Sequence, residues 1–126
     1  MNKILALFLL FFASTSNAIT IIAPVIEVSP KTEKYYADIE QRIEWYKRYP
    51  LIAQVKGMQG DVVLEVTFDE KGKVITSRIN KSSGNQYLDQ GGLDTIENAA
   101  PFPAPPIELL ESNKLTVLVP IYFRLS

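Results

Sequence analysis

The stretch that decides the fold is KLTVLVPIYFRL, residues 114–125. Its apolar residues alternate with the others without a lapse, and they are Leu115, Val117, Val119, Ile121, Phe123 and Leu125. A period of two is typical of a β-strand that buries one face. Pro120 has no backbone N–H, and proline within a strand is confined to sheet edges. The stretch therefore predicts a C-terminal strand at the edge of a sheet.

Two further strands are predicted upstream, as a hairpin. DVVLEVTF, residues 61–68, also alternates, and its apolar face holds Val62, Leu64, Val66 and Phe68. DEKG, residues 69–72, predicts a tight turn in which Gly72 can adopt a positive φ angle. The return strand KVITSRINK, residues 73–81, is less regular, and we expect Ile75 and Ile79 to share one face.

An amphipathic helix is predicted before the hairpin, over about residues 30–48. Ser29-Pro30 is a typical helix start, and the apolar residues that follow recur at spacings of three and four: Tyr36, Ile39, Ile43 and Tyr46. Pro50 ends this helix and can open another. Leu51, Val55 and Met58 predict one or two helical turns, which Gly57 ends in a left-handed conformation.

The last helix is predicted over about residues 86–99, with Asn85 as its cap. Its expected buried residues are Leu88, Leu93, Ile96 and Ala100. Gly91 and Gly92 each cost about 1 kcal/mol relative to alanine, which predicts a weak or kinked helix. If the glycine has helical backbone angles, replacing it with alanine is expected to stabilise the chain by about 0.5–1 kcal/mol, whereas a loss of stability would mean a positive φ angle or a close contact. PFPAPP, residues 101–106, should run extended.

The order of these elements predicts an α+β domain with one three-stranded antiparallel sheet packed with helices. The hairpin supplies two strands, and the C-terminal strand returns beside the first of them. Backbone groups two residues apart in a strand point the same way, so Thr116, Leu118 and Tyr122 should direct theirs outward with Pro120.

The first residues predict export. Lys3 precedes an apolar run from Ile4 to Phe12, and small and polar residues follow to Ala18, as in a signal peptide of residues 1–18 cleaved at that point. The alternative is an uncleaved membrane anchor, although the run is shorter than the roughly 20 residues of a span. Residues 19–44 are then an N-terminal arm and most of the amphipathic helix, and residues 45–126 form the domain.

Composition argues against several classes of function. The chain has 13 basic and 14 acidic residues, which are interspersed, and this balance excludes a nucleic-acid-binding surface. It has no histidine and no cysteine, so the usual general base, thiol nucleophile and commonest metal ligands are missing. Asp69 with Glu70, and Glu108 with Glu111, are interpreted as solvated charges. We expect no catalytic residue, metal, cofactor or small-molecule substrate.

The order and spacing of several motifs resemble the C-terminal domain of TonB and its relatives, over about residues 45–125. The motifs are Tyr49-Pro50, LIAQVKGM, Gly60 before a strand, FDEKGKV, SSGNQYLDQGGLDTIENAAPFPAPP and VPIYFRL. The resemblance implies a periplasmic protein-interaction module. Such a module takes an extended segment of an outer-membrane transporter or another envelope protein and adds it as a strand to the sheet edge.

The resemblance and the edge strand together give a set of candidate partner-binding residues, which are Thr116, Leu118, Tyr122, Tyr49, Pro50 and Gln54. For residues 49–60 two interpretations stay open, a structural turn and a position near the partner's groove. Two alternative functions also stay open. One is a self-associating envelope module that forms a homodimer through the edge strand, and the other is a membrane-anchored energy transducer that retains its N-terminal segment.

Overall fold

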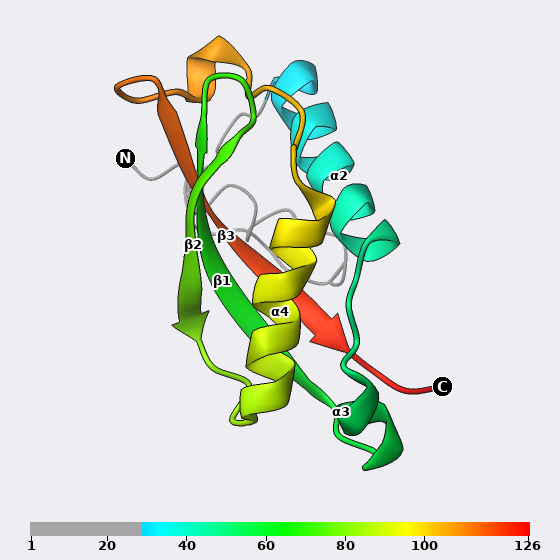
Figure 1. The fold of residues 1–126 in the computed structure, drawn as a ribbon. Coiled ribbons are helices and arrows are strands. Elements are labelled where there is room, and N and C mark those ends of the chain that lie inside the picture. Colours follow the sequence, from blue (N-terminus) through cyan, green and yellow to red (C-terminus); the bar gives the residue numbers. More distant parts are fainter. Residues whose placement is uncertain (1–28) are drawn as a thin grey trace, which may run out of the picture.

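The structure is a computed structural model that describes residues 29–126 (Figure 1). The predicted signal peptide, residues 1–18, and arm, residues 19–28, lie outside the described residues. Three strands form one antiparallel sheet: β1 (Gly60–Asp69), β2 (Val74–Lys81) and β3 (Lys114–Phe123). The strand order is β2-β1-β3, with both neighbours antiparallel to β1. The predicted α+β fold, with the C-terminal strand beside the first strand, is confirmed.

The two edges of the sheet differ in regularity. β3 pairs with β1 continuously, from Gly60 opposite Phe123 to Asp69 opposite Lys114. The pairing of β2 is interrupted by register shifts between Val63 and Leu64 and between Thr67 and Phe68. The second shift sets Val74 opposite Phe68 and leaves Ile75 43% exposed. The prediction that Ile75 shares the inner face with Ile79 is therefore wrong, because a bulge shifts the side-chain alternation.

Helices α2 (Pro30–Trp45) and α4 (Gln86–Ala99) lie on one face of the sheet, and the short helix α3 (Leu51–Val55) lies near one end of it (Figure 1). A 3₁₀ turn, η1 (Ile107–Leu109), precedes β3. Ser29 caps α2 through the Thr32 N–H, and Asn85 caps α4 as predicted. α2 ends before the predicted residue 48, because the Arg48 N–H leaves the helix and donates to the Thr95 hydroxyl, 2.8 Å away.

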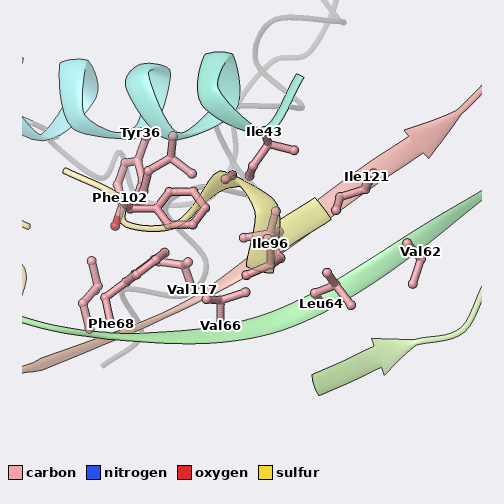
Figure 2. Packing of buried hydrophobic residues seen from close by; sticks show 14 of the residues in the cluster. Tyr36, Ile43, Val62, Leu64, Val66, Phe68, Ile96, Phe102, Val117 and Ile121 are labelled. Carbon is pink, nitrogen blue, oxygen red and sulfur yellow. The ribbon is translucent and has the colours of Figure 1, made fainter. Parts of the chain in front are cut away.

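The core lies between the sheet and these helices (Figure 2). The predicted faces of β1 and β3 supply Val62, Leu64, Val66 and Phe68 and every alternate residue from Leu115 to Phe123. α2 contributes Tyr36, Ile39 and Ile43, and α4 contributes Leu88 and Ile96. Leu93 and Ala100 are only partly buried against this core. α2 therefore belongs to the same core as the sheet.

Gly91 and Gly92 lie within α4, which runs without interruption from Gln86 to Ala99. A Cβ on Gly91 would lie 2.8 Å from Pro50 Cδ and 2.9 Å from the Arg48 carbonyl, and one on Gly92 would lie 2.8 Å from Val62 Cγ1. These close contacts favour the other expected outcome, a loss of stability on replacement by alanine. Both glycines let other parts of the chain approach α4 closely.

Among residues 29–126 no helix has the length and apolar character needed to cross a membrane. The same part of the chain contains no group of three or more acidic side chains placed to hold a metal ion.

Candidate partner-binding edge

The outer edge of β3 is the candidate site, and the contacts at its two ends fix the direction of its backbone. At the end of the strand, the Lys47 ammonium donates to the Tyr122 carbonyl, 2.7 Å away. At the start, Lys114 exchanges both backbone hydrogen bonds with Glu111, at 2.8 and 3.0 Å. Neither Lys47 nor Glu111 belongs to β1, so Lys114 and Tyr122 direct these groups away from it. The same direction recurs at every second residue.

Between these two ends the edge is open to backbone pairing, with Thr116 and Leu118 half-buried and the Pro120 side chain buried. The outward groups are the N–H and C=O of Thr116 and Leu118 and the C=O of Pro120, which has no N–H. Within residues 29–126, neither Thr116 nor Leu118 makes a backbone hydrogen bond outside the sheet. The stretch from Thr116 to Pro120 is roughly 13 Å long at the rise of a β-strand. We call it the open stretch.

A turn closes the start of the edge. Ser112 and Asn113 have φ angles of 53° and 63°, and they join Glu111 to Lys114. Two successive positive φ angles are typical of a type I′ hairpin turn, which folds Glu111 back against Lys114. The turn therefore covers the backbone of Lys114 and limits a guest strand at this end.

A groove of about 600 Å³ runs between α2 and the second half of β3. Its strand wall is Val119, Pro120, Ile121 and Tyr122, and its helix wall is Ala37, Asp38, Glu40, Gln41, Ile43, Glu44 and Lys47. Side chains on the helix side of a guest strand beside β3 would point into this groove. The open stretch and the groove meet at Val119 and Pro120.

Three carboxylates stand on the helix wall, and two of them have a cation beside them. Asp38 pairs with Lys34 at 2.9 Å, and Glu44 pairs with Lys47 at 2.7 Å. The Glu40 carboxylate takes part in none of the ion pairs or side-chain hydrogen bonds of residues 29–126. Burial raises the pKa of the Glu40 carboxyl above its ordinary value.

The six predicted partner-binding residues fall into two groups. Thr116 and Leu118 lie on the open stretch, and Tyr122 lies at its closed end. The Tyr49 ring packs edge-on against Phe123, 5.2 Å between centroids, and its hydroxyl donates to the Met58 carbonyl. Tyr49 is thus beside the last residue of β3, on the helix side.

Pro50 and Gln54 lie farther from the edge. The Pro50 ring faces Gly91 of α4, and the Gln54 amide donates to the Tyr49 carbonyl at 3.0 Å. Both residues hold the turn that follows α2. Leu51 and Val55 of α3, the helix after this turn, are 73% and 76% exposed, and Ala53 is the residue of α3 that is buried.

Sequence reasoning missed Lys47, Glu111 and Glu40. Lys47 and Glu40 act on Tyr122, which is remote in the chain, and periodicity within one element carries no such signal. Glu111 acts on Lys114 across a two-residue turn. The contact of Glu111 could have been expected from the sequence SNK, residues 112–114, because serine and asparagine are typical of a tight turn before a strand.

The family model for the Gram-negative bacterial TonB protein C-terminal matches residues 46–125, which is more than half of the chain. The chain belongs to the TonB C-terminal family. TonB of Pseudomonas putida is 34% identical over 92 residues, which are 73% of this chain and 38% of that protein. TonB of Pasteurella multocida is 33% identical, over 73% of this chain and 34% of that protein. The chain spans about a third of the length of these relatives.

Solved structures agree with the TonB C-terminal assignment. A solution structure of the Helicobacter pylori TonB C-terminal domain matches with a TM-score of 0.57 at 26% identity, covering 71% of this chain and 91% of that one. The HasB C-terminal domain matches with a TM-score of 0.52 at 26% identity and covers 88% of each chain. The TonB C-terminal match begins after α2, although α2 shares the core.

Proposed function

We propose that this TonB C-terminal domain is a periplasmic protein-interaction module that adds an extended segment of an outer-membrane transport protein to β3 as a fourth strand. The observation that carries the proposal is the open stretch Thr116–Pro120, which lies between two closed ends of the edge. Strand addition takes its affinity from main-chain hydrogen bonds and its specificity from pockets for alternate side chains. The open stretch supplies the first, and the groove against α2 supplies the second.

The β3 edge suits a guest strand better than the β2 edge. β3 is regular over its whole length, whereas the register of β2 shifts twice. β2 also carries Arg78 and Lys81, and its neighbour in the turn is Lys73. Bulges and lysine or arginine side chains are devices by which edge strands discourage pairing. We therefore assign the partner to β3 alone.

A proline pair tests this assignment. Leu118 directs its N–H outward, so Leu118→Pro removes a donor from the open stretch but none from the ladder with β1. Val117 lies opposite Val66 and directs its N–H toward β1, so Val117→Pro breaks the ladder. We expect Leu118→Pro to keep the far-UV circular dichroism of the folded chain and Val117→Pro to lose it.

Binding is measured by fluorescence polarisation with a labelled, periplasm-facing extended segment of an outer-membrane transport protein. We expect the wild-type chain to bind and Leu118→Pro to bind at least tenfold more weakly, since it loses a hydrogen bond and meets the proline ring. Normal binding by a folded Leu118→Pro would contradict the assignment to β3. A wild-type chain that forms dimers and ignores the peptide would favour the homodimer instead.

A further inference from the structure

We propose that the extended partner carries a lysine or arginine side chain that pairs with Glu40, so that the groove selects a basic segment. The inference rests on the proposed strand addition at β3, because only a guest strand on this edge would bring a side chain to the helix wall of the groove. Main-chain hydrogen bonds do not select side chains, so a pairing with Glu40 would add a preference for a basic residue in the partner.

Glu40 is the carboxylate on the helix wall of the groove that has no ion pair with a lysine or arginine among residues 29–126. Lys34 and Lys47 offset Asp38 and Glu44, which leaves one uncompensated negative charge on the helix wall. A partly desolvated carboxylate without a cation is held at a cost, and a cation that reaches it recovers that cost. The charge also bears on Tyr122 across the groove: burial raises the pKa of the Tyr122 phenol, and Asp61 and Glu40 raise it further.

The position of Glu40 along the groove selects one residue of the guest. α2 and β3 begin at the same end of the domain, where the Ser29 hydroxyl lies 3.4 Å from the Glu108 carboxylate. They meet again at Lys47 and Tyr122. Glu40 is roughly 8 Å before the end of α2 at Trp45, and Lys47 follows two residues later. Val119 is roughly 10 Å before Tyr122 along the strand.

Glu40 is therefore level with Val119, a core-facing residue at the border of the open stretch. A guest residue paired across from Val119 points its side chain to the same face of the sheet. The long, flexible side chain of lysine or arginine can reach from that position to the helix wall. An acidic residue at the same position would meet three carboxylates, which include Asp38 and Glu44, and would be disfavoured.

The test begins with a phage-displayed library of random linear peptides, selected on the purified chain and in parallel on Glu40→Gln. Glu97→Gln is the matched control, because Glu97 is an exposed carboxylate on α4 outside the groove. We expect apolar-alternating peptides with lysine or arginine at one fixed position on the wild-type chain and on Glu97→Gln. The apolar alternation should persist on Glu40→Gln, and the basic preference should disappear.

Affinities then give the size of the effect. Replacing the selected lysine or arginine with glutamine should weaken binding to the wild-type chain roughly tenfold, as expected for a hydrogen bond to a charged group. The same replacement should change the affinity of Glu40→Gln by less than about twofold, because the two changes remove the same contact.

The outcomes separate this inference from the proposed function. Peptides that need Leu118 but carry no fixed basic residue, or whose basic preference survives Glu40→Gln, would overturn the pairing with Glu40 and leave strand addition standing. Peptides that bind Leu118→Pro at normal strength would overturn strand addition at β3 and the pairing with it. Enrichment of no peptide, with a chain that dimerises, would overturn both.

Discussion

Gly91 shows at the scale of one residue why a helix can keep a glycine that costs it stability. The Tyr49-Pro50 turn crosses α4 at this position, and the Arg48 N–H is bonded there to Thr95. A methyl group on Gly91 would need to displace a proline ring and a backbone carbonyl rather than a flexible side chain. The Tyr49-Pro50 turn after α2 thus has a structural role, which is close packing on α4.

Gly91→Ala should therefore lower the free energy of unfolding by about 1–3 kcal/mol, the usual cost of overpacking, despite the better helix propensity of alanine. Urea denaturation followed by circular dichroism measures the change. Gln90→Ala, at an exposed position one residue earlier, controls for propensity and should have an effect within about 0.5 kcal/mol. A Gly91→Ala variant more stable than the wild-type chain would show that Pro50 moves away from α4 without cost.

The loop before α4 shows how one carboxylate organises the start of a helix at the scale of an element. Asp89 accepts hydrogen bonds from the Ser83 N–H at 2.8 Å and from the hydroxyls of Ser82 and Ser83 at 2.5 and 2.7 Å. Burial acts to raise the pKa of Asp89, but these hydrogen bonds outweigh it and leave the pKa below its ordinary value. The ionised carboxylate is therefore the form that holds the loop.

Stability from Asp89 should depend on pH in a defined direction. A carboxyl group whose pKa is lower in the folded than in the unfolded chain stabilises the fold above its unfolded pKa. That stability is lost as the pH falls through the folded pKa, so for Asp89 it is present at neutral pH and disappears below about pH 4. The contribution should stay below about 1 kcal/mol, since the group is largely solvated.

Urea denaturation of the wild-type chain and Asp89→Asn at pH 7 and pH 3 measures this contribution. We expect the variant to be less stable at pH 7 and the difference to shrink at pH 3. Asp94→Asn, on the same helix, is the charge-matched control; its carboxylate accepts a hydrogen bond from the Gln90 side chain. A difference for Asp89→Asn that is equal at both pH values would mean that packing of the side chain, not its charge, holds the loop.

The sequence predicts an element well when the residues that define the element lie close together in the chain. The strands, the Asn85 cap and the turn at Gly72 depend on residues within a few positions of one another, so local patterns predict them. Ile75 depends on a bulge, which is defined by the pairing partner and not by β2 itself. Gly91 depends on Pro50, which is remote in the chain. Contacts of the last kind leave no periodic signal.

The candidate site follows the same rule. Pro120 alone predicted which residues of β3 turn their backbone outward, and the contacts of Lys114 and Tyr122 agree with that direction. The limits of the open stretch depend on Lys47 and Glu111, and the charge of the groove depends on how Lys34 and Lys47 are used. These features appear only when α2 is placed beside β3.

At the scale of the whole molecule, one sheet has its helices on a single face and two edges of unlike character (Figure 1). The β2 edge is bulged and carries basic side chains, and the β3 edge is regular and open between Thr116 and Pro120. We propose that a fourth strand extends the sheet at β3, where the core-facing residues already pack in the same core as α2. Pairing of a partner with the open stretch is therefore the central proposal for this molecule.

Backbone amide hydrogen exchange, measured residue by residue by NMR with and without a bound peptide selected on the chain, tests that claim most directly. The account predicts that the peptide slows exchange at the N–H groups of Thr116 and Leu118 and leaves the amides of β2 unchanged, because only the former gain hydrogen-bond acceptors. Slower exchange along β2 or α3, with no change at Thr116 and Leu118, would contradict it.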